Sequence, residues 1–349
     1  MTMTSDSRKS KKINERVLIR GNECYMHHWK PQNDTPKALA VIYHGFLAHG
    51  NYPTVRYAAE FMVESGFAVV AFDFPGHGRS EGLKGYLESV ESVIADGVAM
   101  VEHAQTLYPG KGLFLVGSSM GGAIALLVSQ SIDKKVSGVV LLAPMLQLNV
   151  SYVERSLLSG LAFFMPTASI IPSSATNSEK QYRDPLKRKE CDEDPLTVSG
   201  SSLRVASADT CVDIASQIQA QFHSIDCPFL LAIADEDVVV KNVGSEKLYS
   251  QSPSADKTKK NYPALHGLLC EPSPLFDQIK NDILTWMIQR AWSRWEAMIS
   301  CNSFLRNRGW GLCLLSRSIA YETIAFLKLI FTKQINSFGH QFRKFIYSN

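Results

Sequence analysis

A serine, a carboxylate and a histidine, the three groups of a nucleophilic hydrolase, stand at informative places in this sequence. Ser119 is the centre of Gly117-Ser118-Ser119-Met120-Gly121, which fits the pattern Gly-x-Ser-x-Gly. An apolar, strand-like run precedes this pentapeptide and a helix-like stretch follows it. A serine at such a strand–turn–helix junction is held out above the end of its strand, where its hydroxyl can attack a carbonyl carbon. The pattern therefore predicts Ser119 as a nucleophile.

A serine hydroxyl needs a base to take its proton and a carboxylate to orient that base. In folds with this turn, the three groups follow the order serine, acid, histidine, with the last two in loops after late strands. Asp237 follows the apolar run 228–234, and His266 follows the run that ends at Tyr262. We predict His266 as the general base and Asp237 as its orienting carboxylate. Asp235 is the competing acid, and Asp237 is preferred because it lies further from the strand.

The tetrahedral intermediate of such a reaction carries an oxyanion that must be stabilised by N–H donors. The backbone N–H of Met120, next to the nucleophile at a helix start, is the first predicted donor. The second is expected in the loop after the apolar run 39–43, which reads His44-Gly45-Phe46. We predict the N–H of Phe46 as this donor, and we expect His44 and Gly45 to shape the turn without transferring protons.

Asp73 and His77, in the loop 72–80, also look like catalytic candidates. Both precede the nucleophile, which is the wrong order for this fold. We therefore predict structural roles for them, in a tight connection where Gly76 and Gly78 take unusual backbone angles.

The order of elements along the chain indicates an α/β fold. Two short strands at 16–19 and 23–29 are predicted to form a hairpin. Continuous apolar runs separated by helical patterns then predict a mostly parallel sheet with helices on both faces. The expected strands are 39–43, 67–72, 113–116, 136–142, 229–234 and 259–262, and the expected helices are 55–64, 90–107, 122–131, 247–252 and 275–295.

The alternation of strands and helices breaks between residues 145 and 225, a stretch too long for a connector. We expect this insertion to form a cap, or lid, between two parts of a core at 15–144 and 226–298. Its apolar segment 157–165 has two open interpretations, a helix buried against the main body or a lid that admits an acyl chain. Residues 1–14 are expected to be a polar basic leader. Residues 299–349 are expected to be a basic, apolar extension, either disordered or an amphipathic helix on a membrane surface.

Composition argues against a nucleic-acid-binding protein. The 349 residues carry a net charge of +3. The first 20 residues hold six basic and two acidic side chains and residues 290–349 hold nine and two, which leaves residues 21–289 with 21 basic against 29 acidic. An acidic body with basic ends lacks the concentrated positive face that nucleic acids require.

The seven cysteines are odd in number and show no C-x-x-C spacing, so we expect free thiols and neither disulfides nor a zinc site. No secretory signal and no long uncharged apolar stretch is found. We expect a cytoplasmic protein, with peripheral membrane contact through the cap or the C-terminal extension left open.

Taken together, these motifs resemble the monoacylglycerol lipase and lysophospholipase group of the α/β-hydrolases. That group combines a His-Gly oxyanion loop, a D-x-x-G-H-G-x-S-E-G loop, a G-x-S-M-G-G turn, and a later aspartate and histidine. The corresponding stretches here are His44-Gly45, DFPGHGRSEG from Asp73, GSSMGG from Gly117, Asp237 and His266. The resemblance covers roughly residues 15–290 and implies an α/β-hydrolase fold with an inserted cap.

The resemblance also implies a function, the serine-dependent hydrolysis of carboxylic esters through an acyl-enzyme. Monoacylglycerols or related lipid esters are the expected substrates, and no metal or organic cofactor is implied. Lysophospholipase, phenolic-ester (caffeoyl-type) esterase and aminopeptidase activities are alternatives on the same scaffold. A catalytically silent binding protein is a more distant alternative. The expected partner is a small-molecule or lipid ester and not a nucleic acid, and the oligomeric state is not predicted.

Overall fold

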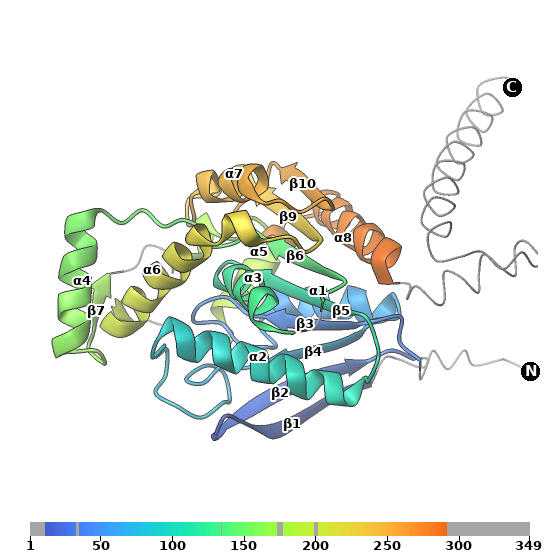
Figure 1. Ribbon diagram of the computed structural model, residues 1–349, viewed down its shortest axis with the longest axis horizontal. Helices are drawn as coiled ribbons and strands as arrows, with labels where there is room; N and C mark the ends of the chain where they lie inside the picture. The colour runs from blue at the N-terminus through green and yellow to red at the C-terminus, as the bar shows by residue number, and fades with distance from the viewer. Residues whose placement is uncertain (1–10, 33–34, 134, 173–176, 199–201, 292–349) are drawn as a thin grey trace, which may run out of the picture. The chain divides into compact units, whose positions relative to one another are not determined.

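The structure, a computed structural model, describes residues 11–32, 35–133, 135–172, 177–198 and 202–291. Its strands are β1 (Lys11–Ile19), β2 (Asn22–Lys30), β3 (Leu39–Tyr43), β4 (Ala68–Phe72), β5 (Leu113–Ser118), β6 (Gly138–Leu142), β7 (Ser169–Pro172), β8 (Ser202–Arg204), β9 (Phe229–Ala234) and β10 (Lys257–Tyr262). Eight of them form one sheet in the order β1-β2-β4-β3-β5-β6-β9-β10 (Figure 1). The hairpin β1–β2 and the pair β2–β4 are antiparallel, and every later pair of neighbours in this sheet is parallel.

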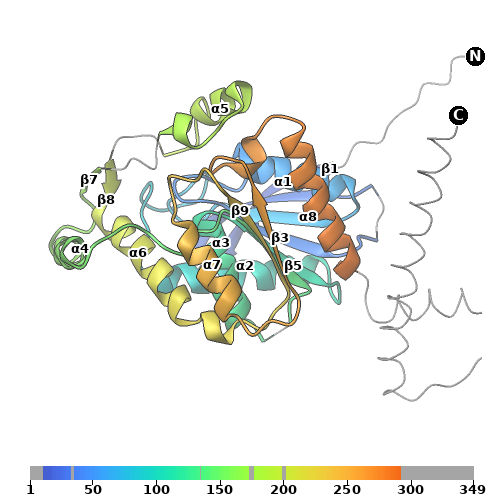
Figure 2. The same cartoon turned by 90° about the horizontal axis from the view of Figure 1, so that it is seen from above.

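Helices cover both faces of this sheet, as the sequence predicts. The helices that belong to the body are α1 (Pro53–Glu64), α2 (Val90–Leu107), α3 (Met120–Ser131), α7 (Asn242–Gln251) and α8 (Leu275–Ala291). Successive side chains of a strand point to opposite faces. In β5, Leu115 packs in a core with α2 and α3, whereas Phe114 and Val116 pack in a second core with α1 and α8. Helices α1 and α8 lie on one face of the sheet, and α2 and α3 lie on the other (Figure 2). The predicted mostly parallel sheet between two helical layers is therefore confirmed.

The predicted boundaries agree best where a run is buried on both faces. β3, β9 and α2 begin and end at the predicted residues. β1 begins at Lys11, four residues before the predicted start of the core, because it extends as an edge strand paired with β2. α8 is described as far as Ala291, and the predicted extension 299–349 lies outside the described residues.

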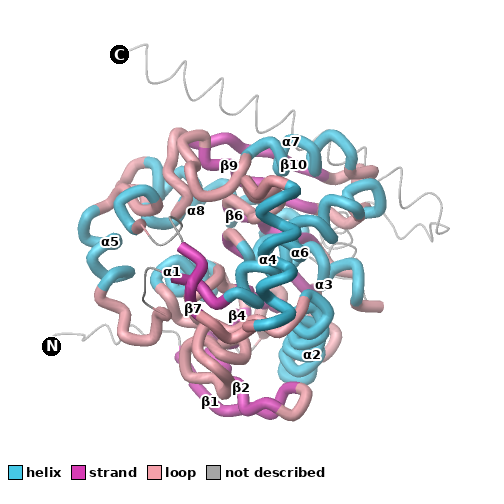
Figure 3. Tube along the Cα trace, turned by 90° about the vertical axis from the view of Figure 1, so that its left-hand side faces the viewer, coloured by secondary structure: helices cyan, strands magenta, loops and turns pink. Residues whose placement is uncertain are grey.

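Within the described residues, the segment 145–225 contributes no strand to the large sheet. It contains α4 (Tyr152–Phe164), the strands β7 and β8, a 3-10 turn η2 (Ser178–Lys180), α5 (Pro185–Asp192), α6 (Val205–Ala220) and a 3-10 turn η3 (Phe222–Ser224). Ile214 and Ile218 of α6 are buried in the core that also contains α3. α4 runs beside α6, on the side away from the sheet (Figure 3). The boundaries predicted for a cap, 145–225, stay a prediction.

The buried-helix interpretation of the apolar segment 157–165 is wrong, because α4 has no buried residue. Phe163 and Phe164 are 82% and 81% exposed. The helix starts with a capping box between Ser151 and Glu154. Polar contacts join it to α6, such as the hydrogen bond of 2.9 Å from the Ser159 hydroxyl to Oδ1 of Asp209. A helix held by its polar side leaves its apolar side uncovered.

Two further predictions concern cysteines and membrane spans. The described cysteines, Cys24, Cys191, Cys211, Cys227 and Cys270, are all free, and all of them except Cys227 are buried. Cys301 and Cys313 lie outside the described residues. Among the described helices, none has the length and apolar character needed to cross a lipid bilayer.

Candidate active site

Ser119 occupies a backbone conformation that few residues with a side chain adopt. Its φ is 55° and its ψ is −122°, directly between the end of β5 and the first residue of α3. Strained backbone of this kind costs about 1–3 kcal/mol and persists only where the surroundings impose it. Two hydrogen bonds impose this conformation here, one from Ser119 N–H to Leu142 O at 3.0 Å and one from Met145 N–H to Ser119 O at 2.8 Å.

The two glycines of the turn have no room for a side chain. A Cβ on Gly117 would overlap the carbonyl oxygen of Gly121, and a Cβ on Gly121 would overlap the carbonyl oxygen of Tyr43 in β3. Both obstacles are backbone atoms, which cannot move aside. The Gly-x-Ser-x-Gly spacing is therefore required by the close packing of β5, α3 and β3 around the serine.

Asp237 and His266 come together at the same edge of the sheet. β9 and β10 are parallel neighbours, so the loops after them leave the sheet on one side. Oδ2 of Asp237 lies 2.7 Å from Nδ1 of His266. The Asp237 side chain is fully buried, and its Oδ1 accepts the backbone N–H groups of Val239 at 2.8 Å and Val240 at 3.0 Å. This carboxylate is thus fixed on one oxygen and faces the imidazole with the other.

The competing acid, Asp235, points elsewhere. Its Oδ1 accepts a hydrogen bond from the side-chain amide of Asn261 at 2.7 Å. Of the two acids left open by the sequence, Asp237 is the one in contact with His266.

The contact between Asp237 and His266 determines what the imidazole can do. An ionised carboxylate only accepts hydrogen bonds, so Nδ1 of His266 donates and Nε2 keeps a free lone pair. That lone pair can take a proton from a hydroxyl group. Ser119 belongs to the same carboxyl edge, because β5 is parallel to β6, which is parallel to β9.

The predicted oxyanion loop packs against the nucleophile. A Cβ built on Gly45 would lie 3.7 Å from Cβ of Ser119. Neither Phe46 nor Met120 donates its backbone N–H to a protein acceptor within the described ranges of the chain. Two unused N–H groups beside a serine are what an oxyanion site requires. The roles of Ser119, Asp237, His266, Phe46 and Met120 in catalysis stay predictions.

His44 ties this loop to the next one. It is fully buried, its Nδ1–H donates to Gly45 O at 2.8 Å, and its Nε2 accepts the N–H of Phe74 at 3.1 Å. Burial, followed by the neighbouring His77, lowers the pKa of His44 to about 3. The ring is therefore neutral near pH 7 and holds two loops together, in agreement with its predicted role in the turn.

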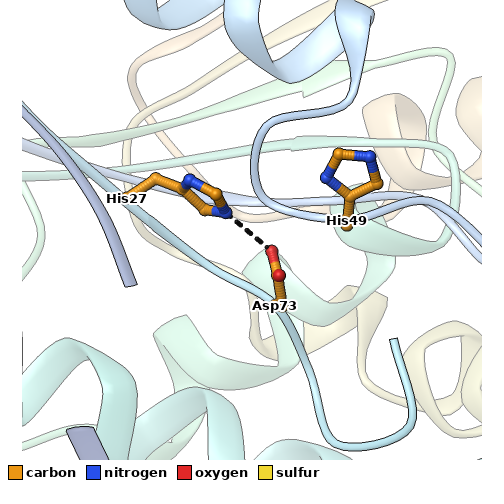
Figure 4. Close-up of side chains that lie close together, drawn as sticks. All are labelled: His27, His49 and Asp73. Carbon is orange, nitrogen blue, oxygen red and sulfur yellow. Dashed lines mark hydrogen bonds and ion pairs between the residues drawn. The ribbon is translucent and has the colours of Figure 1, made fainter. Parts of the chain in front are cut away.

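Asp73 anchors the loop 72–80 from inside the protein. Its Oδ1 accepts a hydrogen bond from His27 Nε2 at 2.9 Å (Figure 4). The same oxygen accepts the N–H of Gly50 at 2.6 Å, and Oδ2 accepts the N–H of Arg79 at 2.8 Å. Burial raises the pKa of Asp73, but the hydrogen bond and charge of His27, with the N–H of Arg79, outweigh burial and hold the pKa below its usual value. A Cβ on Gly78, which has a φ of 54°, would overlap Oδ2 of Asp73.

His27, His49 and Asp73 offer ligand atoms within 4.8 Å of one another, the spacing of a candidate metal site. These atoms are already engaged, however. His49 donates from Nε2 to Asp194 at 3.0 Å and accepts the N–H of Asn51 on Nδ1 at 3.2 Å. With the oxygens of Asp73 also occupied, we assign the three residues to holding the loops in place.

The sequence analysis missed three charged residues next to the site. Nε of Arg183 lies 2.8 Å from Oε2 of Glu271, and its Nη2 lies 3.0 Å from Oε1 of Glu236. Glu236 precedes Asp237, and Glu271 follows His266 by five residues. The only available signal was the position of the two glutamates beside predicted catalytic residues, because an arginine in a charged loop is typical of solvated surface.

Comparisons with known proteins agree with this geometry. Residues 34–273 match the family model described as serine aminopeptidase, S33. Monoglyceride lipase of Rattus norvegicus is 29% identical over 277 residues, which cover 77% of this chain and 88% of the relative. Caffeoylshikimate esterase of Arabidopsis thaliana is 28% identical over 272 residues, which cover 74% of this chain and 80% of the relative.

A solved structure shows the same fold. A soluble variant of monoglyceride lipase from Saccharomyces cerevisiae, in complex with a substrate analog, superposes with a TM-score of 0.71 at 21% identity. The superposition covers 83% of this chain and 98% of that structure. The chain therefore belongs to the serine aminopeptidase S33 family, in the monoacylglycerol lipase group of the α/β-hydrolase superfamily.

Proposed function

We propose that this protein is a serine ester hydrolase that cleaves monoacylglycerols or related lipid esters. The observation that carries the proposal is the 2.7 Å hydrogen bond between His266 and Asp237, at the sheet edge where Ser119 takes its strained turn. Relatives named as monoglyceride lipases, matched over 77% of the chain, support a lipid ester as the substrate.

In the first half of the reaction, Oγ of Ser119 attacks the ester carbonyl carbon while Nε2 of His266 takes the hydroxyl proton. The backbone N–H groups of Phe46 and Met120 stabilise the resulting oxyanion. Asp237 holds the imidazole and stabilises its positive charge. The carbon–oxygen bond to the alcohol then breaks, the histidine returns its proton to the leaving alcohol oxygen, and an acyl-enzyme remains.

In the second half, water replaces the alcohol. His266 takes a proton from the water as it attacks the acyl carbon, and the same two N–H groups stabilise the second oxyanion. The bond to Ser119 breaks, the proton passes to its Oγ, and the carboxylic acid is released. No step requires a group beyond these five residues.

The substrate class is the part of the proposal that has competing alternatives, because other enzymes of this scaffold cleave other esters. Relatives include a caffeoylshikimate esterase and a phospholipase, so phenolic esters and lysophospholipids are the competing substrates. The uncovered apolar side of α4 favours a lipid, because it gives the segment 145–225 affinity for acyl chains.

We propose further that residues 145–225 form the cap over the site and that α4 contacts lipid surfaces. Tyr152, Val153, Leu157 and the Phe163–Phe164 pair are all exposed on this helix. Burying such side chains at a membrane interface gains about 25 cal/mol per Å² of apolar surface. A cytoplasmic location is part of the same proposal.

The test compares the wild-type protein with the Ser119→Ala variant in two assays. A fluorophosphonate probe should label the wild type and leave the variant unlabelled. Monoacylglycerol, lysophosphatidylcholine and p-nitrophenyl esters should then be hydrolysed in that order of preference. Equal labelling of both proteins would show that Ser119 is not the activated nucleophile, and an unlabelled wild type would favour a silent binding protein. Labelling without hydrolysis of any lipid ester would overturn the substrate assignment.

A further inference from the structure

The loop that carries His266 is held largely from outside the sheet. This loop, residues 263–271, lies between β10 and α8 and contains one 3-10 turn, η4 (Leu268–Cys270). Several hydrogen bonds come to it from residues 181–187. Gly267 N–H donates to Gln181 O at 2.8 Å, Asp184 N–H donates to Cys270 O at 3.1 Å, and Lys187 Nζ donates to Glu271 O at 2.8 Å.

The packing of residues 181–187 on this loop is close. A Cβ on Gly267, the residue after His266, would overlap the ring of Tyr182. The hydroxyl of Tyr182 lies 3.0 Å from that of Tyr52, so the ring is held in place from its other end. The backbone beside His266 therefore has little freedom to move toward residues 181–187.

Glu271 adds a buried charge to this arrangement. The residue is fully buried, and its Oε1 accepts the N–H of Leu265, the residue before His266, at 2.7 Å. Its Oε2 makes no hydrogen bond of good geometry within the described residues, so the ion pair with Arg183 at 2.8 Å is what compensates this oxygen. A buried carboxylate that loses its partner is costly, and the loop would have to rearrange to expose it.

Arg183 also reaches the second loop of the site. Its Nη2 lies 3.0 Å from Oε1 of Glu236, the residue before Asp237. The N–H of Glu236 donates to Ala264 O at 3.0 Å, which links the two loops at their bases. A guanidinium group has several donors in a rigid plane and can bridge two carboxylates in a fixed geometry.

We propose that Arg183 is a positioning residue that fixes the His266 loop against the Asp237 loop. It touches neither the reacting atoms nor the catalytic side chains, and it acts through Glu271 and Glu236. The role in catalysis rests on the proposed ester hydrolase function. The role in ordering the loop does not.

The first experiment measures ester hydrolysis by Arg183→Met, which keeps the aliphatic stem and removes both ion pairs. We expect kcat to fall about tenfold with KM unchanged, because small displacements of catalytic groups cost one to two orders of magnitude in rate. Fluorophosphonate labelling should slow by the same factor. Arg183→Lys should recover part of kcat, since it keeps the charge opposite Glu271.

Arg188→Met is the matched control, because Arg188 lies in α5 and pairs only with Glu179 among the described residues. A kcat of Arg183→Met within twofold of wild type, or a rise in KM alone, would overturn the proposal.

The second experiment does not depend on activity. Amide hydrogen exchange at Leu265 and Gly267 should be faster in Arg183→Met than in the wild type and unchanged in Arg188→Met. Unchanged exchange in both variants would overturn the positioning role. If the wild type hydrolyses no ester but exchange is still faster in Arg183→Met, the positioning role is supported and only the proposed function is refuted.

A double variant tests whether Arg183 acts through Glu271. Glu271→Gln keeps an oxygen for the N–H of Leu265 and removes the buried charge. In this background Arg183→Met leaves no uncompensated carboxylate at position 271, so its effect on exchange should be smaller than in the wild type. An equal effect in the two backgrounds would show that Arg183 does not act through Glu271.

Discussion

Asp237 and His266 lie in the loops that follow two neighbouring parallel strands, β9 and β10, and their contact is direct. Nδ1 of the imidazole lies 2.7 Å from Oδ2 of the carboxylate, whose other oxygen is held by two backbone N–H groups. The Asp237 side chain is fully buried. A carboxylate held in this way can set the orientation of the imidazole and the nitrogen that carries its proton.

Replacing Asp237 by asparagine should reduce kcat for ester hydrolysis by about 10³–10⁴-fold, because an amide group supports the wrong imidazole tautomer. Asp235→Asn is the matched control, since Asp235 bonds only to Asn261 among the described contacts of its side chain. Steady-state kinetics on p-nitrophenyl butyrate measure both. A larger loss in Asp235→Asn would reverse the assignment of the acid.

Replacing Gly121 by alanine should lower the free energy of unfolding by about 1–3 kcal/mol, the usual cost of overpacking. The new methyl group would overlap the carbonyl oxygen of Tyr43 in β3. Gly160→Ala is the opposite case, because a Cβ there meets nothing within 4 Å and lies on the helix α4. Its expected effect is a gain of about 0.5–1 kcal/mol. Urea unfolding of the two variants gives both values, and similar effects would contradict this account of the turn.

Lowering the pH should destabilise the protein through His44. Burial lowers the pKa of this residue from 6.5 to about 3, so between these values the unfolded chain binds a proton that the folded chain does not. Stability therefore falls as the pH falls. The contribution of His44 between pH 7 and pH 5 is about 2 kcal/mol, at 1.36 kcal/mol per pKa unit. His44→Gln, which does not titrate, should lose that much less stability over the same range in urea unfolding. Parallel pH profiles for the two proteins would refute the assignment.

Replacing Phe163 and Phe164 by serine should leave the melting temperature unchanged, because both rings are more than four-fifths exposed. Binding to phosphatidylcholine vesicles in a flotation assay should weaken, and hydrolysis of vesicle-borne monoacylglycerol should slow. Hydrolysis of a water-soluble short-chain ester serves as the control and should not change. Loss of activity on both substrates would place the two rings in the reaction site itself, against the proposed contact with lipid.

Periodicity was sufficient to predict those elements whose environment is uniform. β3 and β9 are buried along their whole length, so their apolar runs begin and end with the strands. The residues of the turn around Ser119 were found because a strand, a glycine pair and a helix must follow one another there. The exposure of α4 could not be predicted, since apolar residues at helical spacing look the same whether a neighbouring element covers them or not.

Contacts between residues far apart in the sequence set the second limit on what the sequence can predict. Arg183 is separated by more than fifty residues from Glu236 and by more than eighty from Glu271, and no local pattern pairs these side chains. The choice between Asp235 and Asp237 was of the same kind. It depended on which side chain turns toward the neighbouring loop, a property of the backbone after β9 that two aspartates two positions apart do not reveal.

The contacts of residues 181–187 with the loop of His266 limit how enzymes of this scaffold can change their substrates. In an exchange of the segment 145–225 for that of a relative, the shape of the acyl site and the support of the histidine would be replaced together. Chimeras that lack a counterpart of Arg183 should therefore have a low kcat on every ester, including the esters that they bind well.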